Sequence, residues 1–298
     1  MDIGKNIKEL RLSKMMTQTE LAGHEITRNM LSRIENGAAL PSLGTVIYLA
    51  ERLGVPAGLL LAEDGDTFVF LKNNLLNNIK KAFNDNNLEL CIDMCNELLN
   101  QTDDDEIALI MVEATYRLAE NELLNGHLYR SRELLDNAIL YSQSTVYNTS
   151  TILHCAKNLF YHLRKISPTL DSDNIDSKKH ALTSRNIAYS SELCAYLNIL
   201  DDINNGVYNT AEACDFELNS ALFSRHIAAK LAIKKGMYEN ALEILISAVE
   251  NEDMIPKFIM YLISADIEIC SKEICDYKRA YEYSINKISL LENMLSEG

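Results

Sequence analysis

A local pattern of thirteen residues recurs along the chain and restricts it to a small set of folds. In each copy a turn residue is followed two positions later by Tyr or Leu, and Ala or Ser stands three positions further on. An amphipathic helical pattern precedes each copy, so the sequence predicts a stack of helical hairpins. The copies are GHLYRSRELLDNA (126–138), GVYNTAEACDFEL (206–218), GMYENALEILISA (236–248), CDYKRAYEYSINK (275–287) and, more weakly, NNLELCIDMCNEL (86–98).

These repeats predict an all-α fold in which small residues let the paired helices approach each other and an aromatic residue fills the turn. Only one proline, Pro168, lies between residues 57 and 255, and strand patterns are almost absent. This part of the chain resembles the tetratricopeptide repeat. We expect five or six hairpins in a right-handed superhelix with a concave inner surface, including an irregular pair between 143 and 190 and a loop at 167–176. The predicted small contact residues are Ser131, Ala211, Ala241 and Ala280.

The first sixty residues predict a separate five-helix domain. Ile3, Ile7 and Leu10 have helical spacing. The TQTE segment at 17–20 has the form of a capping box, which opens a short second helix. Thr27 caps a third helix that ends at Asn36-Gly37, Ser42 caps a fourth, and GVP at 54–56 begins a fifth.

The third predicted helix is polar on one side and apolar on the other. At about 100° per residue, Arg28, Asn29, Ser32 and Arg33 share one side, whereas Met30, Leu31 and Ile34 share the opposite side. Arginine and asparagine bind guanine and adenine edges in the major groove through paired hydrogen bonds. An ordinary solvated helix face is the alternative interpretation, but a short capped helix, a turn and a second helix are what a helix-turn-helix motif requires.

Charge also separates the two parts of the chain. The whole chain carries a formal charge of −15. Residues 1–61 carry +1 and the remainder −16. The N-terminal part therefore escapes the argument that an acidic protein avoids nucleic acid. We predict a DNA-binding domain at 1–64 and a ligand-sensing and dimerisation domain at 65–298.

Residues 3–61, with TQTELA, TRNMLSRIENG and PSLGTVIYLAERLGVP, resemble the lambda-repressor-like helix-turn-helix family (Cro/repressor, XRE). The resemblance implies that Arg11 and Glu35 form a structural ion pair. It also implies that Gln18 and Asn36 contact the DNA backbone and that the third helix faces the bases. The predicted DNA-binding residues are Gln18, Thr27, Arg28, Asn29, Ser32, Arg33 and Asn36.

The combination of this domain with helical repeats resembles the RRNPP peptide-pheromone receptors of low-GC Gram-positive bacteria (PlcR- and Rgg-like regulators). The resemblance implies a cytoplasmic homodimer that binds operator DNA, and a short imported peptide inside the superhelix that changes dimer geometry. Aligning the repeats places the inner surface on the first helix of each hairpin. The predicted peptide-binding residues are Glu113, Tyr116, Glu120, Asn158, Tyr161, Tyr196, Phe223, His226 and Lys230.

Other chemistry finds no support in the sequence. The seven cysteines are an odd number scattered through apolar patterns, and we expect them to pack in the core. SPTLDSDNID lacks EF-hand spacing, and no phosphate loop or hydrolase motif is present, so we expect no enzyme activity, metal or cofactor. No run long enough to span a membrane and no signal peptide is expected. Two alternatives remain open: a repressor controlled by a protein partner, and a scaffold that has lost DNA binding.

Overall fold

The computed structural model describes residues 3–61, 67–100, 104–170, 191–206, 218–252 and 254–296. Within these ranges the chain is helical and contains no strand, which confirms the all-α prediction. It divides into two compact units, Met1–Asp103 and Asp104–Gly298. The predicted domain boundary at 64/65 lies outside the described residues.

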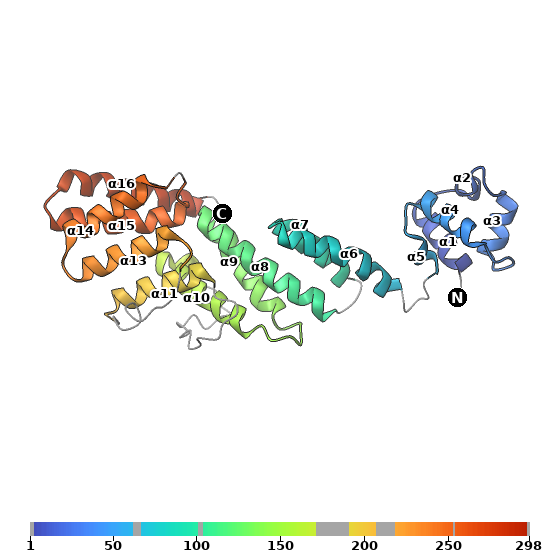
Figure 1. Cartoon of the computed structure of the whole chain (residues 1–298), viewed down its shortest axis with the longest axis horizontal. Coiled ribbons are helices and arrows are strands. Elements are labelled where there is room, and N and C mark those ends of the chain that lie inside the picture. Colours follow the sequence, from blue (N-terminus) through green and yellow to red (C-terminus); the bar gives the residue numbers. More distant parts are fainter. Residues whose placement is uncertain are drawn as a thin grey trace. The chain divides into compact units, whose positions relative to one another are not determined.

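The first unit begins with the five predicted helices: α1 (Ile3–Ser13), α2 (Gln18–Ala22), α3 (Arg28–Glu35), α4 (Leu43–Leu53) and α5 (Ala57–Leu61) (Figure 1). Apolar side chains from all five form one small core. All three predicted N-caps are present. Thr17 and Glu20 form the reciprocal capping box, the Thr27 hydroxyl accepts from the Met30 N–H, and the Ser42 hydroxyl accepts from the Thr45 N–H.

A helical hairpin completes the first unit. It consists of α6 (Thr67–Asn84) and α7 (Leu88–Leu99). Ile79 of α6 and Leu88, Cys91, Cys95 and Leu98 of α7 are buried. The positions in α7 repeat at intervals of three and four, so a single apolar stripe forms the buried side of this helix.

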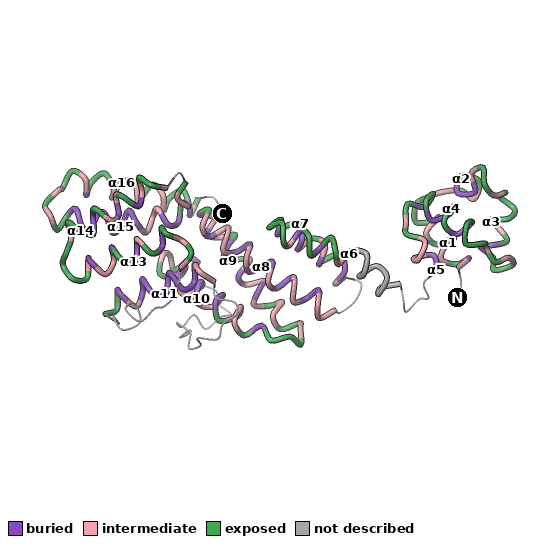
Figure 2. Tube along the Cα trace, in the orientation of Figure 1, coloured by how far each residue is buried: buried purple, intermediate pink, exposed green. Residues whose placement is uncertain are grey.

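The second unit is built from long helices that pack mainly in sequential pairs (Figure 1). α8 (Asp105–Asn125) pairs with α9 (Leu128–Tyr141), α13 (Ala221–Lys234) with α14 (Tyr238–Glu250), and α15 (Lys257–Glu273) with α16 (Tyr277–Ser296). Between the first two pairs lie α10 (Ser150–Ile166), a 3₁₀ turn η1 (Pro168–Leu170) and α11 (Glu192–Asn204). Buried positions follow the facing sides of these helices, and one core connects them (Figure 2).

The turn predicted at the start of each repeat is left-handed in all five copies. The φ angles are +57° at Asn86, +94° at Gly126, +81° at Gly206, +74° at Gly236 and +62° at Cys275. In four copies the next residue's N–H binds a carbonyl five positions back, as in His127 to Glu122 at 2.9 Å. This is the hydrogen-bond pattern of a Schellman motif, which ends the first helix and turns the chain into the second.

The predicted small contact residues are buried where the structure describes them: Ser131, Ala241 and Ala280. The Ser131 hydroxyl also donates to the Ala119 carbonyl at 2.8 Å, which ties α9 to α8. Ala211 lies outside the described residues. The expected filling of every turn by an aromatic residue is wrong for Tyr277, which is 68% exposed.

Core packing of cysteine is confirmed at five positions and wrong at one. Cys275 is exposed because it occupies the left-handed turn between α15 and α16. Cys214 and most of the predicted 167–176 loop lie outside the described residues. The buried cysteines are Cys91, Cys95, Cys155, Cys194 and Cys270.

Two of the turn glycines differ in how closely other side chains pack against them, and this difference can be tested. A Cβ on Gly126 would lie 2.8 Å from Met294 Cγ and 3.3 Å from Lys257 Cβ, whereas a Cβ on Gly236 would meet nothing within 4 Å. We expect Gly236→Ala to cost about 1–2 kcal/mol, from left-handed strain alone. Gly126→Ala should cost about 1–3 kcal/mol more, from overpacking. Urea unfolding of both variants measures the difference, and equal losses would contradict this account.

Candidate DNA-binding surface and ligand cavity

Helix α3 presents the predicted DNA-binding side chains to solvent. Thr27, Arg28, Asn29 and Arg33 are exposed, as is Asn36 at the helix end, and Ser32 is half-buried. The opposite side holds α3 in the domain because Leu31 and Ile34 are fully buried. The polar side is therefore open to a partner, while the apolar side fixes the helix orientation.

Met30 differs from the prediction. We expected it on the packed side with Leu31 and Ile34, but it is 43% exposed. On the wheel it lies at the margin of the apolar side, and it belongs to the first turn of α3, where the Thr27 hydroxyl binds its N–H. The core therefore covers only the later apolar positions of α3.

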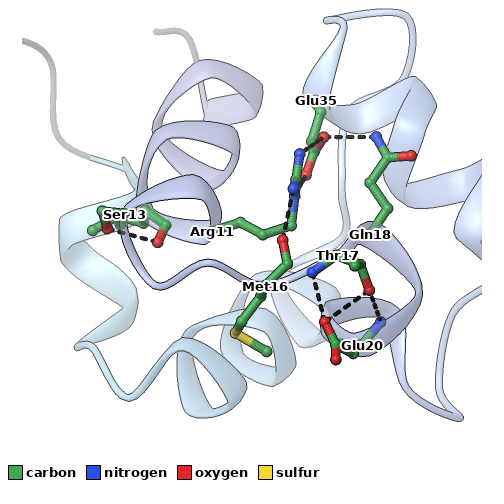
Figure 3. A network of polar contacts seen from close by, with 8 residues as sticks. Arg11, Ser13, Met16, Thr17, Gln18, Glu20 and Glu35 are labelled. Atoms are coloured by element: carbon green, nitrogen blue, oxygen red, sulfur yellow. Dashed lines mark hydrogen bonds and ion pairs between the residues drawn. The ribbon is translucent and has the colours of Figure 1, made fainter.

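The predicted ion pair between Arg11 and Glu35 is present and buried (Figure 3). Arg11 Nε lies 2.7 Å from Glu35 Oε1, and Arg11 Nη2 lies 3.0 Å from Oε2. Arg11 Nη1 also donates to the Met16 carbonyl at 2.8 Å. A two-pronged contact of this kind fixes orientation as well as distance. It ties α1 to the end of α3 and to the segment that leads into α2.

Gln18 joins this network, since its Nε2 donates to Glu35 Oε2 at 2.8 Å (Figure 3). Burial raises the pKa of Glu35, but the hydrogen bonds from Arg11 and Gln18 outweigh it and hold this pKa below its ordinary value. Glu35 is thus a carboxylate at neutral pH, with a fixed set of donors. A phosphate contact by Gln18 remains a prediction.

A close backbone approach supports the same junction. A Cβ on Gly4 would lie 2.0 Å from the Ile34 carbonyl oxygen. Only glycine therefore lets α1 lie this near the end of α3.

A cavity of about 240 Å³ lies among α10, α11, α13 and α15 in the second unit. Leu197, Leu200, Phe258 and Leu262 are among its apolar lining residues. Its polar lining residues are His162, Lys165, Asp201, Asn204, His226, Lys230 and Asp266.

Two buried aspartates organise the polar side of the cavity. Asp266 on α15 accepts from His226 Nε2 at 3.0 Å and Lys230 Nζ at 2.5 Å, both from α13. Asp201 on α11 is bound by Tyr161 Oη at 3.2 Å and by Lys165 Nζ, both from α10. In each case two residues four positions apart on one helix hold an aspartate on another.

These contacts set the charge states of the cluster. Burial raises the pKa of Asp266, but the His226 hydrogen bond and the nearby Lys230 charge reverse this effect and leave it below its ordinary value. Burial lowers the pKa of Lys165, but the hydrogen bond to Asp201 more than compensates, and the net shift is upward. Lys230 therefore faces an ionised Asp266, and Lys165 stays an ammonium beside Asp201.

The predicted peptide-binding residues fall into two groups. His226 and Lys230 line the cavity, and Tyr161 contacts its Asp201. Tyr196 and Phe223 stack at 4.2 Å beside His226, although both aromatic rings are buried. The Tyr196 hydroxyl lies 2.6 Å from His226 Nδ1, so Tyr196 helps to fix the orientation of the histidine ring.

The second group lies on α8 and α10, and its members do not line the cavity. Tyr116 Oη donates to Glu120 Oε1 at 2.7 Å, and the Ser191 hydroxyl binds the same oxygen. Burial raises the pKa of Glu120. Glu113 accepts from Arg117 at 2.7 Å, and Asn158 on α10 is fully buried.

Sequence reasoning missed His162, Lys165, Asp201 and Asp266. A signal for them exists: Lys165 and Asp201 are separated by 36 residues, as are Lys230 and Asp266. A search of the sequence for lysine and aspartate pairs with the same separation would have found both pairs. The alignment of the repeats on their turns did not find the first pair, because α10 and α11 are not joined by a short repeat turn.

The described residues contain no group of three or more His, Cys, Asp or Glu side chains placed to hold a metal ion. Among these residues, no helix is both long and apolar enough to cross a membrane.

Residues 7–60 match the family model described as helix-turn-helix. The N-terminal part is thus a helix-turn-helix domain, a class of domain found in DNA-binding transcription regulators. Comparison with the curated proteins finds no match.

Several solved structures are similar to nearly the whole chain. Bacillus thuringiensis PlcR, in complex with the peptide PapR7 and DNA, is 16% identical with a TM-score of 0.23, over 99% of this chain and 96% of that chain. ComR from S. thermophilus, in complex with DNA and its signalling peptide ComS, is 19% identical with a TM-score of 0.25, over 99% of both chains. The Streptococcus dysgalactiae SHP pheromone receptor Rgg2 is 12% identical with a TM-score of 0.20, over 96% of this chain and 99% of that chain.

The buried ion pair makes a specific prediction for stability. Arg11→Met should destabilise the domain by about 3–5 kcal/mol because it leaves the Glu35 carboxylate buried without the guanidinium that supplies its opposite charge and two of its hydrogen bonds. The double variant Arg11→Met with Glu35→Leu should recover most of this loss, since no unpaired charge remains. Thermal unfolding of the single and double variants gives the coupling. Losses that simply add would show that the pair does not act as a unit.

Proposed function

We propose that this protein is a cytoplasmic, sequence-specific transcription regulator whose helical-repeat domain binds a short signalling peptide and thereby changes operator binding. In this proposal residues 1–64 bind DNA, and residues 65–298 bind the peptide and form the homodimer. It needs no cofactor and no enzyme activity. The single observation that carries it is the exposed polar side of α3 on a helix whose other side is anchored in the core.

The chemistry of α3 fits major-groove recognition. Arg28, Asn29 and Arg33 combine guanidinium and amide groups that pair with base edges. The only acidic residue of α3, Glu35, is buried and bound to Arg11, so it does not repel phosphate from the surface. The side of α3 that meets DNA is therefore cationic, although the chain as a whole is acidic.

Peptide control follows from the geometry that a dimer imposes. Two recognition helices bind half-sites about 34 Å apart, so a modest rotation between protomers decides whether both enter the groove. A ligand that prefers one arrangement shifts the equilibrium by its difference in affinity. The cavity beside Lys165 and Lys230 supports this part of the proposal, because it combines apolar walls with polar groups on helices of the repeat domain.

The DNA-binding part can be tested without knowing the operator. A duplex selected from a random pool by the full-length protein serves as the probe. Arg28→Ala and Arg33→Ala should each cost about 1–3 kcal/mol of binding free energy and relax the preference at one base position. Arg279→Ala, which removes an exposed arginine of α16, is the matched control and should bind normally. Unchanged affinity in both test variants, or no selected sequence, would refute DNA reading.

The peptide part can be tested with fractions of the organism's culture medium, using native mass spectrometry of the full-length protein. A bound peptide should then change affinity for the selected duplex by about 5–150-fold, as allosteric coupling usually does. A scrambled peptide of the same composition is the control. Intact DNA binding with no peptide bound in any fraction would favour control by a protein partner instead.

A further inference from the structure

We infer that the cavity between α10, α11, α13 and α15 is an anion subsite, which takes an apolar residue carrying a carboxylate, such as the C-terminal residue of a peptide. This inference rests on the proposed function for the identity of the whole ligand. The contacts around Asp201 and Asp266 carry it.

In this cavity the lysine side chains are more exposed to a ligand than the aspartate side chains. The side chains of Asp201 and Asp266 are 5% and 3% exposed, whereas those of Lys165 and Lys230 are 47% and 12% exposed. Each aspartate is covered by its own donors. A molecule that enters therefore meets ammonium groups first.

Both ammonium groups are held in place but not used up. An ammonium carries three N–H donors, and the bond from Lys230 to Asp266 needs only one of them. The ammonium group of Lys165 has a second contact besides Asp201, because its Nζ lies 4.6 Å from the centre of the Tyr161 ring. Holding the lysines beforehand reduces the rotamer entropy that anion binding would otherwise cost.

The rest of the cavity fits an apolar side chain. Phe258, Leu197, Leu200 and Leu262 form its apolar walls. Its volume of about 240 Å³ falls below the roughly 300–1,000 Å³ of sites that enclose drug-sized ligands. A cavity of about 150 Å³ is enough for a benzene-sized group. The space thus suits one residue of a longer ligand and not the whole ligand.

Of the two histidines that line the cavity, His226 contacts one of these aspartates, and His162 contacts Asn198. His162 Nε2 lies 3.0 Å from Asn198 Oδ1, and His226 is bound between Tyr196 and Asp266. Two lysines against two aspartates leave the charged lining near neutrality when both histidines are neutral. An entering carboxylate adds one negative charge beside two lysines, and this arrangement favours charge-assisted hydrogen bonds.

Small probes test the subsite independently of any peptide or DNA. N-acetyl-leucine carries a terminal carboxylate, N-acetyl-leucinamide carries none, and N-acetyl-aspartyl-leucinamide carries one on a side chain only. Saturation-transfer NMR titrations with the full-length protein compare their dissociation constants. We expect N-acetyl-leucine to bind at least about tenfold more tightly than its amide, because charge-assisted hydrogen bonds are lost with the amide. If N-acetyl-aspartyl-leucinamide binds as tightly as N-acetyl-leucine, the subsite recognises the carboxylate of an acidic side chain and not that of a C-terminus.

Variants locate the effect. Lys165→Gln with Lys230→Gln should abolish the preference for the acid, whereas Lys272→Gln, which removes an exposed lysine paired with Glu268 outside the cavity, should keep it. The variant Lys230→Gln with Asp266→Asn replaces the ion pair by a neutral pair, so it leaves no unpaired aspartate that could cause misfolding. This variant should also bind N-acetyl-leucine more weakly. Equal binding of acid and amide, no binding of any probe, or an unchanged preference in the double lysine variant overturns the inference. A medium peptide that still regulates DNA binding would then leave the proposed function standing.

Discussion

Each helical hairpin depends on one backbone requirement: the residue that closes its first helix adopts a left-handed conformation. Five different positions meet it, three with glycine and two with Asn86 and Cys275. Glycine meets it without steric cost and asparagine with little, but Cys275 carries a Cβ into a region that L-residues rarely occupy. Because Schellman hydrogen bonds follow these turns, the second helix starts in a defined direction. Helix pairing, and hence the position of every inward-facing side chain, follows from that direction.

Buried acids also connect helices, including pairs that no such turn joins. Asp201, Asp266 and Glu268 are each bound by lysine from another helix. An unpaired buried carboxylate would cost several kcal/mol, so the lysines are required for folding as well as available to a ligand. The strongly acidic repeat domain can contain such groups inside because lysines are placed beside them. The same placement brings two lysines to one cavity.

Much of this architecture could be predicted from local patterns, and the exceptions have physical causes. The caps at Thr17, Thr27 and Ser42, the five turns and the polar side of α3 depend on neighbours within a few residues, which the sequence displays directly. The cavity depends on residues 36 to 40 positions apart, and their register is set by tertiary packing between α10 and α11. Burial was also misjudged. Tyr196 and Phe223 lie on a first helix as expected, but they face the core and reach the cavity only through His226.

The distribution of charge sets how this protein can recognise DNA. Residues 62–298 carry a formal charge of −16 and repel a phosphate backbone, so nonspecific attraction through counterion release is weak for the chain as a whole. The helix-turn-helix domain compensates locally by burying Glu35 against Arg11 and leaving Arg28 and Arg33 exposed. With little general affinity to rely on, the homodimer that we propose would need correct base contacts from both protomers at once. Its DNA binding would then be sensitive to small changes in protomer geometry, because the loss of one recognition helix from its half-site removes a large part of the attraction that holds the complex.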